Sequence, residues 1–357
     1  MAANFKILPV VGSLYPSSSS SSSFDLHFFT ICLNSLIPME FLLLLILLLL
    51  SLFSHSSSAA LSPDYYRSSC PAFSQIIRDT VTNKQITNPT TAAATLRLFF
   101  HDCLPNGCDA SILISSTPFN AAERNADINL SLPGDAFDIV VRAKTALELS
   151  CPNTVSCADI LAAATRDLLT MVGGPYYTVF LGRKDAKVSK ASGIEGTLPR
   201  PTMSVSEIIR IFASRGFSVQ EMVALSGAHS IGFSHCKEFT TEIFNYSNSH
   251  YNPRFALGLQ RACADYKKNP TLSVFNDVMT PNKFDNMYFK NLQKGLGLLK
   301  SDGGLYSDSR TRPWVEKYAA DESVFFAAFS QAMMKLGGYG VKVGNEGEIR
   351  RRCDVFN

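Results

Sequence analysis

The sequence has little charge and no marked excess of either sign. Lys and Arg total 33 of the 357 residues against 30 Asp and Glu, and charged residues make up 18% of the chain, below the roughly one quarter usual in soluble proteins. Nucleic-acid binding therefore has no compositional support, because it needs concentrated positive charge. The apolar fraction of 46%, with 25 Phe and 12 Tyr, excludes disorder of the whole chain and can build a sizeable core.

A hydrophobic run long enough to cross a membrane with ease is also missing. The apolar run from Phe41 to Phe53 has thirteen positions, of which only Ser51 is not apolar, whereas a spanning helix needs about 20 apolar residues. Small residues follow it as far as Ala60, as in the cleavage region of a signal peptide. We therefore expect a signal peptide over residues 39–59. The alternative is a short membrane anchor that escapes cleavage.

This interpretation makes the first part of the chain unusual. Residues 1–38 contain a tract of seven serines and are a low-complexity leader of doubtful status, because a signal peptide normally begins the chain. Met39 is therefore the expected working start, and residues 60–357 are the expected mature domain.

Cysteine occurs without the spacing of common metal-binding motifs. No two cysteines are separated by only two residues, which argues against a zinc–thiolate site and against a thioether-linked haem. Cys32 lies ahead of the signal run, so eight cysteines remain in the expected mature domain. Behind a signal peptide this even number favours four disulfides, whose pairing the residues alone leave open.

The mature region is expected to be mainly helical. Stretches with apolar residues at helical spacing alternate with Gly, Pro and Asn, and a Ser-x-x-Glu capping box at Ser218 opens one of them. The other expected helices cover residues 90–100, 137–150, 156–171, 204–214, 286–293 and 323–335. A weak strand signal covers residues 177–181, and no repeat or linker divides the region.

Arg97 and His101 stand four residues apart at the end of the first expected helix. This spacing predicts that both side chains lie on one face. A guanidinium beside an imidazole lowers the imidazole pKa and keeps the ring neutral, able to accept a proton. An isolated pair of this kind is more often a surface arginine and a core histidine, but the residues that follow favour a functional pair.

His101 and a second histidine, His229, are each followed directly by a residue with a side-chain oxygen. The oxygen donors nearby are Asp102, Asp109 and Ser111 for the first histidine, and Ser230, Asp277, Thr280 and Asp285 for the second. Carboxylates, hydroxyls and backbone carbonyls in such number suit Ca²⁺, although Asp- and Gly-containing loops are commonly plain turns. Chance is a poor explanation for two histidines that each adjoin such a set of oxygen donors.

Four stretches complete a recognisable pattern: RLFFHDC at 97–103, NGCDAS at 106–111, MVALSGAHSIG at 222–232 and FDN at 284–286. With them the chain resembles the secretory plant haem peroxidases (class III, the horseradish peroxidase type) across residues 61–357. Together these stretches are far more specific than any one short motif. The resemblance implies a helical fold of two subdomains that sandwich one non-covalent haem b, with four disulfides and two calcium sites.

The resemblance gives each histidine a role at the haem. His229 matches the iron ligand, and Asp302 matches the carboxylate that bonds its ring and makes the imidazole more anionic. His101 matches the residue that moves a proton between the peroxide oxygens, and Arg97 matches the one that stabilises the developing charge. The relay that fixes the tautomer of His101 would consist of Glu123 and Asn129.

The resemblance also implies ligands for two calcium ions and a disulfide pairing. The first calcium site would use the side chains of Asp102, Asp109 and Ser111 and the carbonyls of Pro105 and Gly107. The second would use Ser230, Asp277, Thr280, Asp285 and the Lys283 carbonyl. The disulfides would join Cys70 to Cys151, Cys103 to Cys108, Cys157 to Cys353 and Cys236 to Cys263. Of two glycosylation sequons, the one at Asn245 is the expected acceptor, because Asn129 would lie in the pocket.

Several residues depart from the family pattern. Ser230 stands where Thr is usual, Pro105 interrupts the loop after His101, and Tyr177 replaces a Trp. Pro199 matches the donor-site proline, but the aromatic residues usual at the donor entrance are replaced by Asp127, Thr202 and Glu238. The preferred reducing substrate is therefore open. The only tryptophan, Trp314, lies elsewhere, so the sequence gives no support for electron transfer from a tryptophan beside the haem.

The sequence thus predicts a secreted, monomeric haem peroxidase of the extracellular space or cell wall. It would reduce H₂O₂ to water while oxidising small phenolic donors one electron at a time, with roles in peroxide breakdown, oxidative stress and lignin phenol oxidation. It would bind neither nucleic acid nor, after signal cleavage, a membrane. The alternative is a non-catalytic calcium- or wall-binding module. Such a module would be free to lose Arg97 or His101, and both are present.

Overall fold

The computed structural model describes residues 61–244 and 251–357. The signal peptide expected over 39–59, the leader 1–38 and the expected glycosylation acceptor Asn245 lie outside these described residues. Within them, no helix is both long enough and apolar enough to cross a bilayer.

Helices dominate the described residues. The α-helices are α3 (Phe73–Thr87), α4 (Thr91–Asn106), α5 (Gly134–Ser150), α6 (Cys157–Met171), α7 (Val205–Ala213), α8 (Val219–Ser226), α9 (Thr240–Phe244), α10 (Pro253–Ala262), α11 (Met287–Gln293), α12 (Lys300–Ser307), α13 (Arg312–Ala320) and α14 (Glu322–Gly338). Two short strands, β1 (Phe233–His235) and β2 (Ser273–Phe275), pair antiparallel. The fold is mainly α, as the sequence predicts.

The helices predicted from apolar spacing are all present, with shifted ends, but the sequence analysis misses α3, α9, α10, α12 and α13. Helix α3 shows why. Its sequence is rich in polar and β-branched residues, which are modest helix formers. Phe73, Ile77 and Val81 nevertheless recur every fourth residue, and all three are buried. Packing of this face therefore stabilises a helix that local propensity alone does not specify.

The strand predicted over 177–181 is wrong. Residues 174–180 have no regular secondary structure, and only Leu181 pairs, in an isolated bridge with Ser62. The two residues exchange both backbone hydrogen bonds, at 2.8 and 2.9 Å. A strand needs a partner along its length, and the alternating pattern of side chains cannot supply one.

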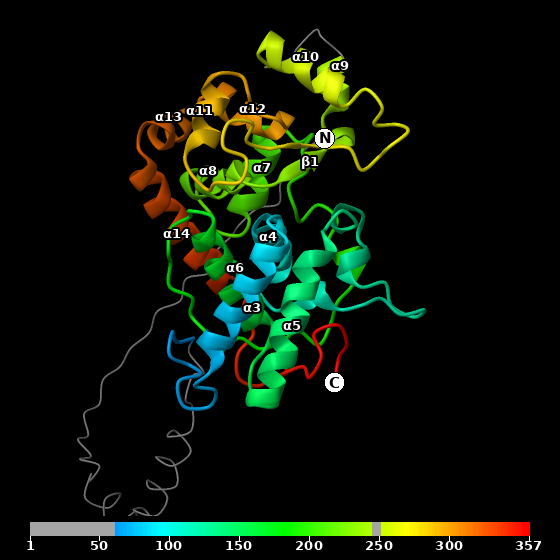
Figure 1. Cartoon of the computed structure of the whole chain (residues 1–357), viewed down its shortest axis with the longest axis vertical. Coiled ribbons are helices and arrows are strands. Elements are labelled where there is room, and N and C mark those ends of the chain that lie inside the picture. Colours follow the sequence, from blue (N-terminus) through cyan, green and yellow to red (C-terminus); the bar gives the residue numbers. More distant parts are fainter. Residues whose placement is uncertain (1–60, 245–250) are drawn as a thin grey trace, which may run out of the picture. The chain divides into compact units, whose positions relative to one another are not determined.

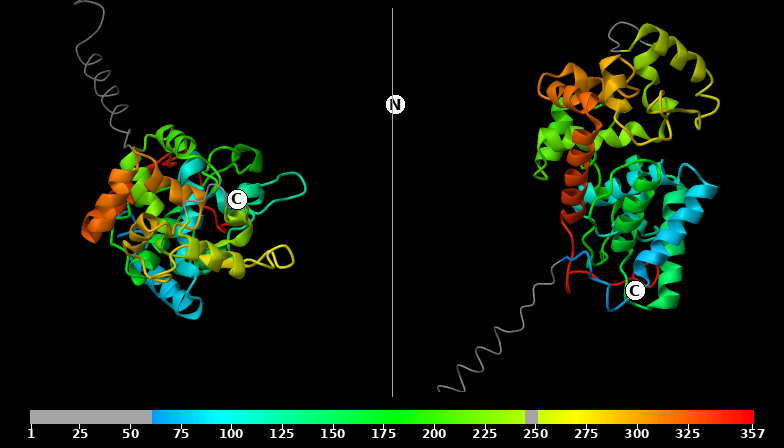
Figure 2. Two further views of the ribbon diagram at one scale, coloured as in Figure 1. Left: turned by 90° about the horizontal axis from the view of Figure 1, so that it is seen from above. Right: turned by 60° about the vertical axis from the view of Figure 1, so that its left-hand side comes forward.

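Two groups of helices form the unit that begins at residue 61. Helices α3, α4, α5 and α6 pack against one another, and α7, α8, α11, α12 and α13 form the other group (Figure 1). Helix α14 contacts both α4 and α8, and Figure 2 shows it running from one group to the other. These groups correspond to the two subdomains that the resemblance implies.

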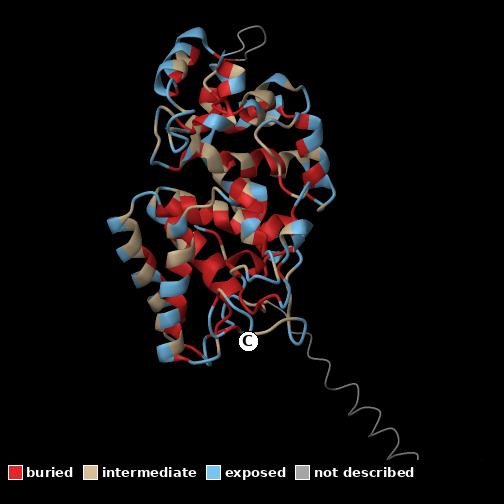
Figure 3. Cartoon of the chain, turned by 90° about the vertical axis from the view of Figure 1, so that its right-hand side faces the viewer, coloured by how far each residue is buried: buried red, intermediate tan, exposed pale blue. Residues whose placement is uncertain are grey.

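The apolar faces of the two groups share one hydrophobic core. Figure 3 shows buried residues on the inward sides of the helices and exposed residues on the outward sides. A second, smaller core lies around α9 and α10, where Phe239, Tyr251 and Leu259 pack near the Cys236–Cys263 disulfide. The disulfide holds together an outlying part of the fold that has little core of its own.

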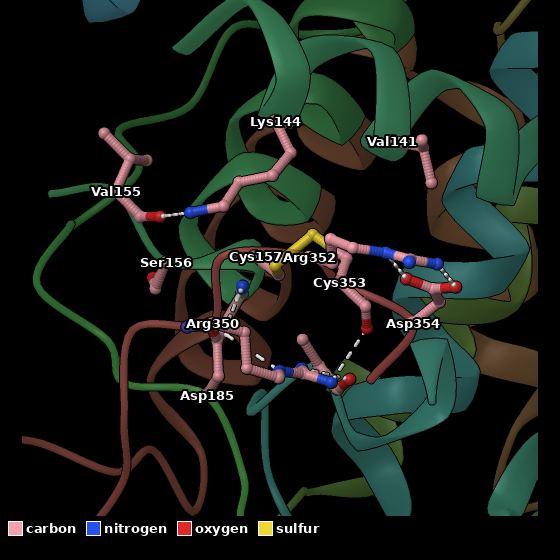
Figure 4. Close-up of a disulfide and its surroundings, with 12 residues drawn as sticks. Val141, Lys144, Val155, Ser156, Cys157, Asp185, Arg350, Arg352, Cys353 and Asp354 are labelled. Atoms are coloured by element: carbon pink, nitrogen blue, oxygen red, sulfur yellow. Dashed lines mark hydrogen bonds and ion pairs between the residues drawn. A yellow bond between two sulfur atoms is a disulfide. The ribbon is translucent and has the colours of Figure 1, made fainter. Parts of the chain in front are cut away.

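The remaining disulfides also join the implied pairs: Cys70 with Cys151, Cys103 with Cys108, and Cys157 with Cys353. Beside the last of them, the fully buried guanidinium of Arg350 donates to the carbonyls of Cys353 and Ala110, at 2.9 and 2.6 Å (Figure 4). The backbone N–H of Arg350 donates to Asp185 at 3.0 Å. The C-terminal segment is thereby tied to the loop that follows His101.

Candidate active site

His101 lies near the end of α4 with one ring nitrogen engaged. Its Nδ1 lies 2.7 Å from Oδ1 of Asn129, and the Asn129 amide is oriented by donating from Nδ2 to the Glu123 carbonyl at 2.8 Å. An amide oxygen can only accept, so this bonding puts the ring proton on Nδ1 and leaves Nε2 as a base. Burial lowers the pKa of His101 to about 3, and the charge of Arg97 adds to the effect.

Glu123 takes part in this chain of hydrogen bonds through its backbone rather than its carboxylate. The carboxylate accepts from the Ser111 hydroxyl at 2.8 Å instead. Burial raises the pKa of Glu123 to about 7, against the lowering effect of that hydrogen bond. The Glu123 side chain therefore bonds the loop after His101, and its backbone carbonyl bonds Asn129.

Arg97, one turn before His101, is held by a residue that the sequence analysis missed. Its guanidinium donates to the Ser131 carbonyl at 3.0 Å and to the Ser131 hydroxyl at 2.9 Å. Burial lowers the pKa of Arg97, but arginine starts so high that the group stays charged. Ser131 follows Asn129 by two residues, so a single loop orients both Arg97 and His101.

His229 is presented by a short 3₁₀ turn, η5 (Gly227–Ser230), directly after α8. Its Nδ1 lies 2.8 Å from Oδ1 of Asp302. The same carboxylate accepts from the Tyr288 hydroxyl at 2.8 Å and from the Leu299 N–H at 3.0 Å. Burial disfavours a charged ring, but the Asp302 charge and hydrogen bond outweigh it, so the pKa of His229 is raised. Tyr288 lies in none of the sequence motifs.

The charge of Arg97 reaches both rings. It adds to the lowering of the His101 pKa and also works against protonation of His229. Within residues 61–244 and 251–357, neither ring uses Nε2 in a hydrogen bond. The His229 side chain is 38% exposed although its partner Asp302 is only 2% exposed. An imidazole fixed at Nδ1, with Nε2 free beside open space, fits an iron ligand of haem.

The loop after His101 gathers buried carboxylates. Asp102, Asp109 and Glu123 are 1%, 3% and 5% exposed. Burial, together with the negative charge of Asp109, raises the pKa of Asp102 well above its ordinary range. Buried carboxylates this close together are costly unless positive charge compensates them.

Lys342, which the sequence analysis missed, supplies part of that charge. Its ammonium donates to Oδ2 of Asp109, while Oδ1 of Asp109 accepts from the Ser111 N–H at 3.0 Å. With all three carboxylates ionised, one ammonium leaves two negative charges, which one divalent cation would neutralise. Among the described residues no three His, Cys, Asp or Glu side chains are arranged to hold a metal. Calcium would therefore also need hydroxyl and carbonyl oxygens.

Pro105 and Gly107 shape the turn of this loop. Pro105 lies inside the last turn of α4, and Gly107 caps the helix with a φ of 116°. A Cβ at position 107 would lie 2.1 Å from the Gly340 carbonyl oxygen. Glycine is thus required both by the left-handed backbone and by the close approach of the C-terminal segment.

The oxygen donors expected near His229 lie within hydrogen-bonding distance of one another. The Ser230 hydroxyl lies 3.1 and 3.0 Å from the carbonyl oxygens of Lys283 and Asp285. The Thr280 hydroxyl lies 3.1 Å from Asp285 Oδ1 and 3.3 Å from Asp277 Oδ2. Burial raises the pKa of Asp277. Two carboxylates, two hydroxyls and a carbonyl therefore share one small volume, which fits a hard cation.

The loop that carries Pro199 is charged where the family usually has aromatic residues. Arg200, missed by the sequence analysis, donates to Asp127 at 2.9 Å and to Glu195 at 3.1 Å. The negative charge of Glu238 acts on Arg97 and raises its pKa against the larger effect of burial. Two of the three side chains expected at a donor entrance, Asp127 and Glu238, are therefore ionic in this chain.

Comparisons with known proteins place the chain in one family. A family model described as "Peroxidase" matches residues 77–321. Peroxidase 31 of Arabidopsis thaliana is 65% identical over 306 residues, which cover 86% of this chain and 96% of the relative. Peroxidase 63 of the same plant is 65% identical over 304 residues, covering 85% and 93%. Peroxidase 65 is 59% identical over 300 residues, covering 84% and 90%.

Proposed function

Because the chain belongs to the class III plant haem peroxidases, we propose that the residues around His101 and His229 serve a secreted enzyme that oxidises phenolic donors. As a member of this family it is a peroxidase that uses haem and H₂O₂. The observation that carries the proposal is the matching arrangement of the two histidines, each held at Nδ1 by a buried polar side chain. Each of those rings is fixed at Nδ1 and free at Nε2.

The residues divide the work between the two sides of the site. His229 would hold the haem iron through Nε2, and Asp302 would keep its Nδ1 proton in place. When bound, haem supplies the redox-active iron that reduces peroxide and then accepts electrons from the donor. His101 would accept a proton from the peroxide at Nε2 and return it to the oxygen that leaves as water. Arg97 would stabilise the negative charge that develops as the O–O bond breaks.

Asn129 and Ser131 would act by positioning. The amide of Asn129 keeps the proton of His101 on Nδ1, so Nε2 is always the nitrogen that meets the peroxide. Ser131 accepts two hydrogen bonds from Arg97, which limits where the guanidinium can point. Glu123 supports Asn129 through its carbonyl.

Two calcium ions would support the two histidines. The first would bind to Asp102, Asp109, Ser111 and the carbonyls of Pro105 and Gly107, and the second to Ser230, Asp277, Thr280, Asp285 and the Lys283 carbonyl. Asp102 follows His101 and Ser230 follows His229, so each ion would fix the backbone beside a catalytic or ligating ring. The buried carboxylates at both places support this proposal.

The proposed donors are small phenols that enter past Pro199, and the proposed location is the cell wall or extracellular space. The biological roles would be peroxide breakdown, the response to oxidative stress and oxidation of lignin phenols. We propose cleavage of a signal peptide over 39–59 to give a monomeric mature protein over 60–357, glycosylated at Asn245. N-terminal sequencing of the secreted protein tests the cleavage; an intact leader would contradict it.

The central experiment is a spectral titration. The protein is produced with haem and Ca²⁺, and the visible spectrum is recorded before and after one equivalent of H₂O₂ and again after a phenol. We expect a ferric Soret band that changes with peroxide and returns with the phenol, and no haem uptake by His229→Ala. If correctly folded, disulfide-bonded wild-type protein takes up no haem, the enzyme assignment of these residues fails. A calcium- or wall-binding module then becomes the better interpretation.

A further inference from the structure

A continuous path of rings leads from His229 to the only tryptophan in the chain, Trp314. Trp314 and Tyr318 lie on α13, with ring centroids 6.5 Å apart. Tyr318 is followed at 5.3 Å by Phe289 of α11, and Phe289 at 5.1 Å by Tyr288. The Tyr288 ring meets the His229 ring edge-on at 6.0 Å. No gap wider than these contacts separates the iron-binding imidazole from Trp314.

The path has one interior end and one outer end. Tyr288, Phe289 and Tyr318 are at most 1% exposed. Trp314 is only partly buried and packs against the edge of the core. The ammonium of the exposed Lys317 lies 5.5 Å from its ring centroid. Of the four rings beyond His229, Trp314 is therefore the one that a molecule in solution can reach.

The hydrogen bonds along the path decide which residue can hold an oxidising equivalent. An oxidised tyrosine must release its phenolic proton, and the Tyr288 hydroxyl already donates to the Asp302 carboxylate at 2.8 Å, which can take the proton and return it. The Tyr318 hydroxyl donates to the neutral Gln220 carbonyl at 3.3 Å, which cannot take one. Trp314 can lose an electron while keeping its proton, so it is the suitable place for an oxidising equivalent to rest.

We propose that Trp314 is a second oxidation site, which serves phenolic polymers too large to enter past Pro199; this rests on the proposed peroxidase function. One electron moves from Trp314 through Tyr318, Phe289 and Tyr288 towards the oxidised cofactor. A phenol group at the surface then returns an electron to the tryptophan radical cation and releases its proton to water. The oxidant is the H₂O₂ that the enzyme already consumes. For each peroxide, two phenol groups lose one electron each and two water molecules form.

Lys317 opposes the charge that this step creates. A positive ammonium over an indole ring stabilises the neutral ring by a cation–π contact and disfavours a radical cation in the same place. Replacing Lys317 by a neutral residue should therefore make Trp314 easier to oxidise. The proposal thus predicts opposite effects for two neighbouring substitutions.

The experiment compares the haem-loaded wild type with Trp314→Phe, Tyr318→Phe and Lys317→Gln. Tyr176→Phe is the matched control, because Tyr176 is 68% exposed and carries the Arg166 guanidinium 4.7 Å from its ring centroid but lies off the path. Each protein is mixed with H₂O₂ and frozen for electron paramagnetic resonance. Each is also assayed with guaiacol and with a soluble lignin polymer. The Soret band and near-ultraviolet circular dichroism check that haem and fold are intact.

We expect a tryptophan-type radical in the wild type and in Tyr176→Phe, and none in Trp314→Phe. Because the chain has one tryptophan, that signal can come from no other residue. Trp314→Phe should lose most polymer oxidation and keep guaiacol oxidation. Tyr318→Phe keeps a ring in the path and should change polymer oxidation little, and Lys317→Gln should gain polymer oxidation. Polymer oxidation at the wild-type rate in Trp314→Phe would overturn the proposal, as would a wild type without the radical. If the wild type also fails to oxidise guaiacol, the proposed peroxidase function is what has failed.

Discussion

The two histidines of the active site are the same residue in opposite electrostatic settings. His101 is buried and lies beside the positive Arg97, so its pKa falls to about 3 although the hydrogen bond to the neutral Asn129 amide opposes this. His229 has the negative Asp302 at Nδ1, so its pKa is raised despite burial. The difference teaches that the partner of Nδ1 decides the role. A neutral partner leaves a base that exchanges protons, whereas an anionic partner gives an electron-rich ligand for a metal.

The largest expected effect comes from removing the base itself. We predict that His101→Ala slows peroxide cleavage by about 10²–10⁴-fold, the usual contribution of a positioned acid–base group, while haem is retained because His229 is unchanged. Asn129→Ala keeps the imidazole but frees its tautomer, so its loss should be smaller. Stopped-flow measurement of the reaction with H₂O₂ checks both variants. Wild-type rates in His101→Ala would remove this residue from the mechanism.

A smaller loss of activity is expected when His229, like His101, is given a neutral partner at Nδ1. Asp302→Asn replaces the anionic partner of His229 by a neutral one and should lower activity by about 10–100-fold, the usual range for such partners. The reduction potential of the iron should rise, because a less anionic imidazole stabilises oxidised iron less. Tyr288→Phe removes a hydrogen bond from Asp302 and should shift the potential the other way. Spectroelectrochemical titration measures both, and shifts of the same sign would contradict the interpretation.

The two clusters of oxygen donors, one beside His101 and one beside His229, allow a third comparison, through their lysines. Lys342 bonds the buried Asp109, so Lys342→Met should strengthen Ca²⁺ binding at the first cluster and destabilise the calcium-free protein. Lys283 is 65% exposed and lies 3.6 Å from Asp285, so Lys283→Met should change stability by less than about 1 kcal/mol. Calcium titration calorimetry and thermal unfolding with and without chelator test this. Equal effects of Lys342→Met and Lys283→Met would contradict the expectation that the ion pair with the more buried lysine contributes more.

The smallest expected effect is an absence of pH dependence. The pKa of His101 is about 3, so the ring stays neutral and the rate of peroxide cleavage should be flat from about pH 5 to about pH 8. The same depressed pKa means that the unfolded chain binds the proton more readily. Its contribution to stability is therefore fully present above about pH 6.5 and is lost as the pH falls towards 3. A rate that titrates with a midpoint near pH 6.5 would show that Arg97 and burial do not control this ring.

The sequence predicted the parts of the site that depend on short separations. Arg97 and His101 lie one helical turn apart, and Asp102, Asp109 and Ser111 lie within ten residues at and after the end of the same helix, so local geometry brings them together. Ser131, Tyr288, Arg200 and Lys342 were missed. Lys342 lies more than 200 residues from Asp109 along the chain, and no local sequence pattern predicts such a contact. The strand expected at 177–181 failed for the same reason, because pairing needs a partner from elsewhere.

The sequence by itself determined the mainly helical class, the even set of cysteines and the two histidines with their adjoining oxygen donors. These follow from local periodicity and from residue chemistry at short spacing. Only the tertiary structure decided that Asp302 meets His229, that Lys342 bonds Asp109, and that rings from α11 and α13 connect His229 to Trp314. Electrostatic and ring contacts act over a few ångströms in space, and folding alone sets those distances between remote residues.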